Sequence, residues 1–322
     1  MTVGWVIGRR GLLGASTHDA MLARDRWAAI AVDSLPWDHP EDLEEEAAKA
    51  FGALVAESAR LGQPWSVLWL AGAGVTHSSE ESFALELNGL RAVLSGCRRH
   101  IGTTDHTGVF FYASSAGGVY AGASGSPYSE FTPVAPISPY GRFKVEAERL
   151  VVEFAQACGV SSLVGRIANV YGPGQRLEKM QGLISQLARA QYSDHPATIY
   201  VPLDTIRDYL YSDDCAALIL DACERAETEG RGGPIHVAKI LASGDGVTVG
   251  SLLGEIKLVT KRAPNVMLAN SSSAAFQSSD LRFRSVVWPE LDARELTPLP
   301  AGIRSTLDAV LARIQEPRSR GV

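Results

Sequence analysis

Short apolar runs alternate with longer amphipathic segments over the first half of the chain. In the longer segments, apolar residues recur at the spacing of a helix. The apolar runs cover residues 3–7, 28–32, 66–71, 108–113 and 162–167, and the helical segments cover residues 12–24, 41–60, 80–99 and 139–157. Buried strands separated by helices form βαβ units, whose strands lie parallel in one sheet. The pattern therefore predicts an α/β fold built on a doubly wound parallel sheet of the Rossmann type.

The regular alternation of apolar runs and helical segments changes after about residue 171. Helical patterns at 177–191, 213–227 and 249–259 alternate with strand candidates at 198–201 and 234–237. The Ser/Ala-rich segment 269–280 is typical of a surface loop, and the polar tail 316–322 of a frayed end. We expect a dinucleotide-binding domain of residues 1–171 plus about 207–240, and a smaller substrate domain of residues 172–206 and 241–322.

Composition narrows the class of protein. Of the 322 residues, 46% are hydrophobic and 20% are charged, which is enough to fill a sizeable globular core. A net charge of −6 argues against a nucleic-acid partner, because phosphate backbones bind basic surfaces. The four cysteines form no CxxC or Cys/His cluster, so no metal site is predicted. No secretory signal and no membrane-length apolar segment is evident, so we expect a soluble, cytoplasmic protein without a membrane partner.

The first apolar run leads directly into a glycine-rich turn. Gly8, Gly11 and Gly14 are spaced GxxGxxG, and a helical pattern begins at Leu12. Glycines at such a turn let the backbone approach a pyrophosphate, and the helix N-terminus offers N–H groups and a positive dipole end. A glycine-rich turn that binds nothing is the alternative. The position between a strand and a helix favours dinucleotide binding.

Two residues bear on which dinucleotide binds. Asp33 follows the second apolar run, 19 residues after Gly14, where a carboxylate would accept hydrogen bonds from the ribose 2′-hydroxyl of NAD(H). Arg10 lies in the turn itself, where a guanidinium could bind the 2′-phosphate of NADP(H). Asp33 could instead be a turn former and Arg10 a solvated charge. NADP(H) is favoured and NAD(H) is the alternative, with Leu70 and Ala71 as further expected contacts.

A candidate acid–base pair lies in the fourth helical segment. Ser138 and Pro139 suit the N-cap and first position of a helix, and Gly159 suits its end. Tyr140 and Lys144 are then four residues apart on one helical face. A neighbouring ammonium and an oxidised nicotinamide would both favour the phenolate that proton transfer requires. YxxxK also occurs by chance as an exposed pair, but here it follows a serine-ended strand and an SPY helix start.

Several further motifs follow in a fixed order. Beside GxxGxxG and SPYxxxK, the chain carries SS…VY at 114–120, RIANVYGPGQ at 166–175 and RDYLYSDD at 207–214. In this combination the chain resembles the NAD-dependent epimerase/dehydratase family of extended short-chain dehydrogenases. The resemblance runs from residue 3 to about 220. It implies a nicotinamide-dependent epimerase or reductase, and a homodimer formed by the helices around Asn88 and Lys144.

The resemblance also implies roles for single residues. A serine or threonine of the family holds the reacting oxygen, and Ser115 is the expected counterpart. Counting back from the VY pair without a gap places that position on Ala116 instead, and Ser114 is a third alternative. Asn169 and Arg207 match positions that hold the sugar-nucleotide part of the substrate, Arg207 through charge-assisted hydrogen bonds to a diphosphate. Arg207 could instead form an ion pair with a nearby aspartate.

Three departures from the family pattern shape the functional hypothesis. The glycine-rich turn before RD is replaced by residues 201–206, and segment 269–280 contains no counterpart of the family's second diphosphate-binding arginine. Residues 116–118 lack the acidic pair of the dehydratases, which disfavours dehydration. We therefore expect Tyr/Lys-assisted hydride transfer at a secondary alcohol or ketone, with a nucleotide sugar as substrate. The alternatives are a ketoreductase for a non-nucleotide natural product and a non-catalytic NAD(P)-binding regulatory or scaffold protein.

Overall fold

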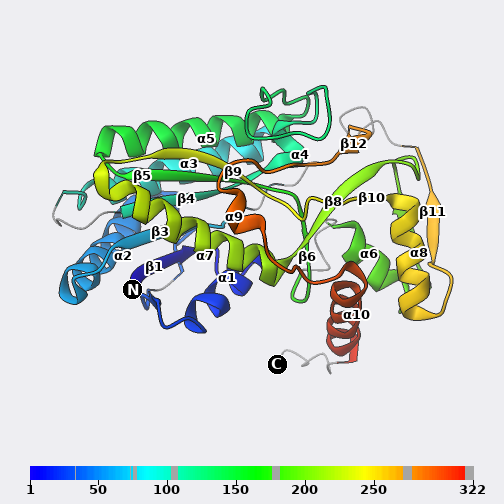
Figure 1. The fold of residues 1–322 in the computed structure, drawn as a ribbon. Helices are drawn as coiled ribbons and strands as arrows, with labels where there is room; N and C mark the ends of the chain where they lie inside the picture. Colours follow the sequence, from blue (N-terminus) through cyan, green and yellow to red (C-terminus); the bar gives the residue numbers. More distant parts are fainter. Residues whose placement is uncertain are drawn as a thin grey trace.

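The computed structural model describes residues 1–32, 34–72, 74, 78–102, 108–175, 182–270 and 278–315 (Figure 1). A central sheet lies between two layers of helices, and a second group of shorter elements continues from one end of it. Two parts of the chain with a prediction of their own lie outside the described residues. They are Asp33, the expected contact of the NAD(H) ribose, and the tail 316–322, expected to be frayed.

The central sheet has six parallel strands in the order β2-β1-β3-β4-β5-β9. Their bounds are β1 Thr2–Ile7, β2 Trp27–Ala29, β3 Trp65–Trp69, β4 Gly108–Ser115, β5 Ser161–Ile167 and β9 His236–Leu241. One face is covered by α2 Pro40–Leu61, α3 Glu80–Arg98 and α5 Pro139–Cys158, and the other by α1 Leu12–Leu22 and α7 Ser212–Glu229. The predicted doubly wound parallel sheet is confirmed.

The edge of this sheet is unusual for a dinucleotide-binding fold. A common order for such folds, 3-2-1-4-5-6, has a further strand outside the second one. Here the described chain leaves β2, passes through residues 34–39 into α2, and then enters β3 on the other side of β1. No strand in the described part of the chain pairs with the outer side of β2. The segment 34–39 thus leads from β2 back to α2, and its Trp37 packs against Trp69 at the end of β3.

The remaining elements form a smaller group at the right of Figure 1. Its sheet joins β6 Asn169–Tyr171, β8 Ile206–Tyr211, β10 Gly246–Thr248 and β12 Asp280–Leu281, while β7 Ala197–Ile199 pairs with β11 Val266–Leu268. The helices are α6 Leu183–Ala190, α8 Val249–Thr260 and α10 Leu299–Gln315, and shorter helical turns elsewhere in the chain are α4 Ala116–Val119, η1 Gly230–Gly232 and α9 Pro289–Asp292. The interpretation of 269–280 as a loop is wrong at its end, because β12 begins at Asp280 and pairs with β8.

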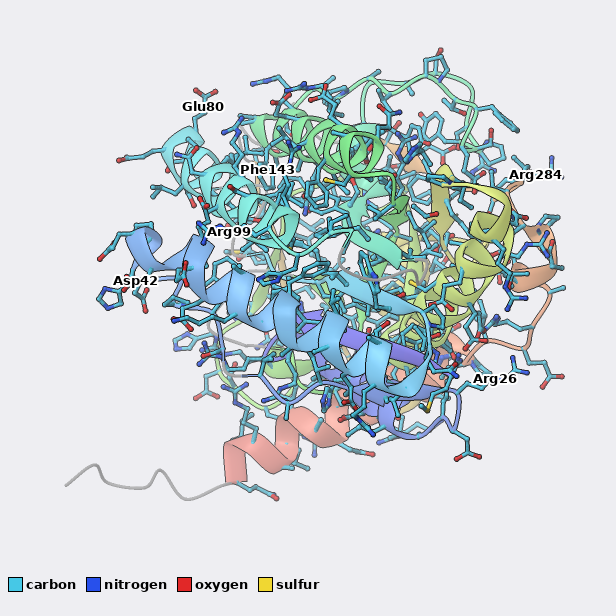
Figure 2. The ribbon with its side chains drawn as sticks, turned by 90° about the vertical axis from the view of Figure 1, so that its left-hand side faces the viewer. Arg26, Asp42, Glu80, Arg99, Phe143 and Arg284 are labelled. Carbon is cyan, nitrogen blue, oxygen red and sulfur yellow. The ribbon has the colours of Figure 1, made fainter. Side chains whose placement is uncertain are left out.

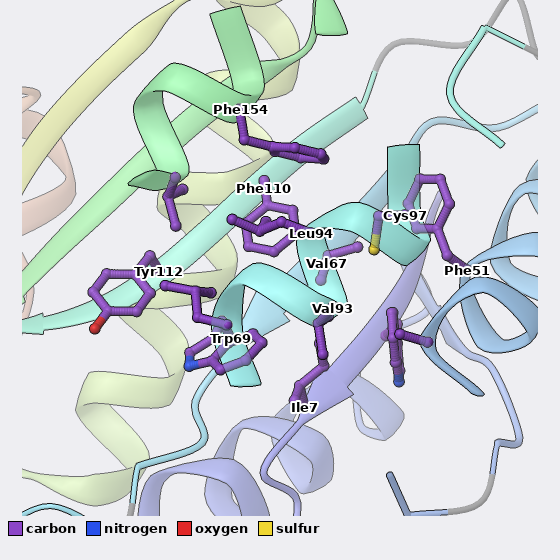
Figure 3. Close-up of a cluster of buried hydrophobic side chains, with 14 of the residues drawn as sticks. Ile7, Phe51, Val67, Trp69, Val93, Leu94, Cys97, Phe110, Tyr112 and Phe154 are labelled. Atoms are coloured by element: carbon purple, nitrogen blue, oxygen red, sulfur yellow. The ribbon is translucent and has the colours of Figure 1, made fainter. Parts of the chain in front are cut away.

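Aromatic side chains fill the space between the sheet and α2, α3 and α5. Phe51 of α2 packs edge-on against Trp65 with ring centroids 5.0 Å apart. Phe110 of β4 packs against Phe154 of α5, with ring centroids 5.7 Å apart (Figure 3). Burial of an aromatic side chain contributes about 1.5–3 kcal/mol. The strands that carry the candidate site thus rest on a rigid core.

Charged side chains tie the outer surfaces of these helices together. Figure 2 shows Arg99, just beyond the end of α3, beside α2, where its guanidinium pairs with Glu44 and Glu45 at 2.6 and 2.7 Å. Phe143 lies between α3 and α5, stacked on Phe83 with ring centroids 5.1 Å apart. Exposed pairs of this kind contribute little stability, so the apolar contacts hold the layer. Among the described residues, no helix combines the length and the apolarity needed to cross a bilayer.

A buried carboxyl predicts a pH-dependent stability. Glu227 of α7 is 9% exposed and accepts hydrogen bonds from Thr2 and Ser66, at 2.8 and 3.1 Å. Burial raises the pKa of Glu227 to about 7 from an ordinary value of 4.5. Between these two pH values Glu227 is protonated in the folded protein and ionised in the unfolded chain. The free energy of unfolding therefore falls as pH rises through this window.

We expect the Glu227→Gln protein to lack this loss, which amounts to about 2–3 kcal/mol of unfolding free energy. Urea unfolding of both proteins at about pH 5 and about pH 8 measures it, with the exposed Glu295→Gln as a matched control. The same pH dependence in wild type and Glu227→Gln would show that this carboxyl is not the source.

Candidate functional site

One large cleft of about 1840 Å³ runs along the carboxyl ends of the central strands and on toward β6, β7 and β8. Open parallel sheets bind their ligands at this edge. The predicted site residues that line the cleft are Gly8, Arg10, Gly11, Leu12, Leu70, Ala71, Ser115, Tyr140, Lys144, Asn169 and Arg207. Gly14 lies behind the turn and is buried. Side chains from distant parts of the sequence thus meet at one surface.

The glycine turn between β1 and α1 is closely packed. Gly8 has φ +96°, and a Cβ there would lie 2.5 Å from the backbone nitrogen of Ala71. At Gly14, a Cβ would lie 2.1 Å from the carbonyl oxygen of Gly8, so a side chain would separate α1 from the turn. Gly11 is the N-cap of α1 and makes no side-chain cap, so the first N–H groups of the helix face the cleft end of β1. This arrangement fits an anionic pyrophosphate.

Gly14→Ala tests this packing. We expect it to weaken dinucleotide binding at least tenfold, because the added methyl group must push the turn away from α1. The matched control is Gly254→Ala in α8, where an added Cβ meets nothing within 4 Å. That change is expected to leave binding unaltered and to stabilise the protein by about 0.5–1 kcal/mol. Isothermal titration with the cofactor and thermal unfolding give both quantities, and equal binding by the two variants would contradict the role of Gly14.

The start of α5 presents the candidate acid–base pair. Ser138 caps the helix by accepting a hydrogen bond from the Gly141 backbone nitrogen at 3.0 Å, as its sequence predicts. Lys144 is 6% exposed, and its Nζ donates to the carbonyl oxygen of Ala113 at 3.1 Å and to Tyr112 Oη at 3.3 Å. It lies 5.8 Å from the ring centroid of Tyr140, whose half-buried ring lines the cleft. The two side chains therefore share one edge of the cleft.

The surroundings keep Lys144 charged. Burial alone would lower the pKa of Lys144, but the phenols of Tyr112 and Tyr140 and the carboxylate of Glu86 together raise it above its ordinary value. Glu86 is held in place by the backbone nitrogen of Gly74, which donates to it at 3.0 Å. Burial raises the pKa of Tyr112 to about 12, so this phenol stays protonated near neutral pH. No local pattern in the sequence indicated Tyr112 or Glu86, because only the fold brings these residues close to Lys144.

The serine end of β4 resolves into three different environments. Ser115 lines the cleft, and its Oγ accepts a hydrogen bond from the Gly118 backbone nitrogen at 3.2 Å. Ala116 is fully buried in a core cluster. Ser114 donates to the carboxylate of Glu148 at 2.5 Å. Of the three candidates, Ser115 combines access to the cleft with an oxygen not committed to a buried ion pair.

The buried ion pair between Arg166 and Glu148 supports the candidate site. Arg166 of β5 donates to both carboxylate oxygens of Glu148 on α5, the shortest contact being 2.8 Å, and to Tyr120 Oη at 2.7 Å. Both charged groups are largely buried, so removal of one partner would leave the other unpaired. The network joins β5, α5 and the residue after α4, and so fixes α5 relative to the end of β4.

The far end of the cleft holds the expected substrate residues. Asn169 is exposed and donates from Nδ2 to the Asp208 carbonyl oxygen at 3.0 Å. Arg207 Nη1 donates to the carbonyl oxygens of Ile206 and Ser278 at 2.8 and 2.9 Å, and burial lowers the pKa of its guanidinium. The carboxylate of Asp208 accepts hydrogen bonds from Ser243 and Gly244. That of Asp214 accepts two from Thr297. Both aspartates that could have paired with Arg207 are therefore held by other groups.

Residues 5–238 match the model of the NAD dependent epimerase/dehydratase family. The chain belongs to this family. The resemblance inferred from its motifs is thereby confirmed. Similar proteins are named as epimerases, reductases and dehydratases.

Two relatives illustrate this range. An uncharacterized UDP-glucose epimerase of Bacillus subtilis is 28% identical over 65% of this chain and 69% of its own length. A dTDP-4-dehydro-6-deoxyglucose reductase of Escherichia coli is 34% identical over 35% of each chain. The chain is thus similar both to a protein named as an epimerase and to one named as a reductase.

Solved structures agree with the fold over its whole length. The UDP-glucose 4-epimerase of Thermotoga maritima, determined with UDP-glucose, covers 98% of this chain and 100% of its own, with a TM-score of 0.75 and 20% identity. The NADPH complex of RMD from Pseudomonas aeruginosa covers 97% and 100%, with a TM-score of 0.74 and 20% identity. At these identities the match establishes the architecture.

Proposed function

We propose that this enzyme of the family transfers a hydride at a secondary alcohol or ketone of a nucleotide sugar, with Tyr140 as general acid–base. The observation that carries the proposal is the single cleft, which holds the pyrophosphate turn at one part and Tyr140, Lys144 and Ser115 at another. A dinucleotide seated on the turn can reach this pair with its nicotinamide end, and the nicotinamide supplies or accepts the hydride.

The side chains divide the work of proton transfer. Tyr140 donates its hydroxyl proton to the carbonyl oxygen during reduction and takes it back during oxidation. Ser115 steadies the same oxygen by a hydrogen bond. Lys144, held by Tyr112 and Ala113, places a positive charge beside the phenol and favours its ionised form. If the ketone is reduced again on its other face, the product is an epimer, and if the cofactor is exchanged, the product is a reduced or oxidised sugar.

The substrate class rests on the other end of the cleft. Arg207 and Asn169 line it together, and a guanidinium is suited to a diphosphate. Several structural neighbours were solved with UDP-sugars, among them UDP-glucose and UDP-glucuronic acid. Thermal unfolding with UDP, GDP and dTDP in turn tests this class. We expect one of the three to raise the Tm of the wild-type enzyme, with the shift lost in Arg207→Ala, whereas no shift with any of them would rule out the nucleotide-sugar assignment.

We propose NADP(H) as the cofactor. Arg9 and Arg10 are exposed at the cleft, and no ion pair engages either one in the described part of the chain. A guanidinium at this position can bind a ribose 2′-phosphate. We expect Arg10→Ala to lower the affinity for NADP(H) about tenfold more than that for NAD(H). Equal effects on the two cofactors in direct titrations would favour NAD(H) instead.

One observation favours a ketoreductase for a non-nucleotide substrate as the second candidate. The segment 269–280 contains no arginine or lysine, and Arg207 already donates to two backbone carbonyls. The nucleoside diphosphate titration separates the two, because a non-nucleotide substrate predicts no stabilisation by any of the three nucleotides. A purely regulatory role is ranked last, because the Tyr140 and Lys144 pair is retained in full beside the cleft.

A further inference from the structure

We propose that Trp37 is the stacking platform for the adenine ring of the nicotinamide dinucleotide. No motif of the sequence pointed to this residue, and the inference rests on the proposed function for the direction in which the cofactor lies. It assigns a binding surface to a segment that connects a strand to a helix and carries no catalytic group.

The direction of the cofactor follows from the order of the strands. The chain goes from β1 outward to β2 on one side and returns to β3 on the other, so the crevice where dinucleotides bind lies between β1 and β3. Tyr140, Lys144 and Ser115 all belong to the β4 side of this crevice. With the nicotinamide on that side, the adenosine half must extend from the glycine turn toward β2.

On the β2 side the sheet simply ends. Folds with the order 3-2-1-4-5-6 place a further strand outside β2, whereas here the described chain runs from β2 through segment 34–39 into α2. Trp37 lies in that segment, lines the cleft and keeps 40% of its surface exposed. The neighbouring cleft residues Leu35, Pro40 and Leu43 are apolar as well. A neutral, flat, aromatic group such as adenine matches this surface better than a sugar or a phosphate does.

The indole of Trp37 is held in place rather than free to turn. It packs edge-on against Trp69, with ring centroids 5.8 Å apart and planes at 86°, and Trp69 itself is 2% exposed at the end of β3. A Cβ on Gly89 of α3 would lie 3.7 Å from Trp37 Cζ3 and 3.6 Å from Leu43 Cδ2, so Trp37 lies close to α3 and to Leu43 of α2. A perpendicular partner can cover at most one face of the indole, and 40% of the Trp37 surface stays exposed. A ring that is already ordered loses little conformational entropy when a base stacks on it.

Substitution of Trp37 gives a direct test with ADP-ribose, which carries the adenine, and nicotinamide mononucleotide, which lacks it. We expect Trp37→Ala to weaken ADP-ribose binding about tenfold to a hundredfold, and Trp37→Phe to restore most of it, because a stacked base depends on the aromatic face. Binding of the mononucleotide should change less than twofold in both variants, roughly the scatter of an unrelated surface change. Phe131→Ala, an exposed aromatic outside the cleft at 81% exposure, is the matched control and should bind both ligands as the wild type does.

The outcomes distinguish a failure of the stacking platform from a failure of the proposed function on which it rests. If Trp37→Ala binds ADP-ribose as tightly as the wild type, or if it weakens the mononucleotide by the same factor, the stacking platform is wrong and the proposed function stands. If the wild-type enzyme binds neither ligand nor the whole cofactor, the proposed function is overturned together with this inference. Circular dichroism of each variant checks that the fold is intact, and a Trp37→Phe protein that is folded but binds like Trp37→Ala also contradicts stacking.

Discussion

Tyr140→Phe is expected to lower kcat for hydride transfer by about 10²–10⁴-fold, the usual contribution of a positioned general acid–base. The substitution removes the oxygen proposed to exchange the substrate proton and keeps the ring that packs against Phe83 and Phe143. Cofactor affinity should therefore change by no more than about threefold, since the variant loses no apolar contact. Pre-steady-state measurement of nicotinamide absorbance, together with a cofactor titration, determines both values.

The control for this variant is Tyr192→Phe, which removes a phenol of similar exposure outside the cleft and should leave kcat unchanged. A Tyr140→Phe enzyme that turns over a genuine substrate at the wild-type rate would assign the acid–base role to another group. A variant that loses cofactor binding instead would show that the hydroxyl acts in binding the cofactor, because the ring is retained in Tyr140→Phe.

Lys144→Met is expected to lower kcat by about 10²–10³-fold and to weaken cofactor binding as well. Methionine keeps much of the volume of the buried side chain but removes the ammonium that contacts Tyr112 and Ala113. Without this charge, the phenolate of Tyr140 loses the neighbour that stabilises it. The pH optimum of the residual oxidation reaction should consequently move to higher pH.

The matched control is Lys257→Met, an exposed lysine on α8, which should behave as the wild type. The pH profile is the decisive readout, because a merely structural role would reduce the rate without moving the optimum. An unchanged optimum in Lys144→Met would therefore contradict an electrostatic role for this lysine.

The parts of the fold that the sequence predicted are those with a strong local signal. All five apolar runs of the first half became strands of the central sheet, because strands buried on both faces must be continuously apolar. The caps Ser138 and Gly159 located α5 to the residue, since each supplies a distinct backbone requirement. The glycine turn and the helix of the acid–base pair are therefore elements with clear local signatures in the sequence.

The parts that escaped prediction depend on contacts between distant segments. Strand β8 was missed because Arg207 and Asp208 interrupt its apolar pattern, and Asp208 is buried there only through hydrogen bonds from residues 243 and 244. The same holds for Tyr112 and Glu86, whose relation to Lys144 comes from packing of α3 and α5 on the sheet. The position of Trp37 at the cleft likewise depends on its packing against Trp69 of β3 and against α3, which no local pattern indicates.

The choice between Ser115 and Ala116 shows the limit of counting along a motif. Without a gap, the count favoured Ala116, yet the turn of α4 carries that residue into the core and leaves Ser115 at the cleft. The pair Gly117 and Gly118 permits this tight turn, since a Cβ on Gly118 would lie 3.1 Å from the ring of Tyr140. Spacing in the sequence does not determine which residue of a short turn lines the cleft and which is buried in the core.

The most direct test of the proposed hydride transfer is movement of deuterium from a nucleotide sugar labelled at the carbinol carbon to the cofactor. Wild-type enzyme is mixed with oxidised cofactor and labelled UDP-, GDP- or dTDP-sugars, and the nicotinamide is analysed by mass spectrometry. We predict label on the nicotinamide with at least one sugar, formed at least 10²-fold more slowly by Tyr140→Phe. Label that forms equally fast in Tyr140→Phe, or no transfer with any of these sugars by an enzyme that binds them, would contradict the proposal.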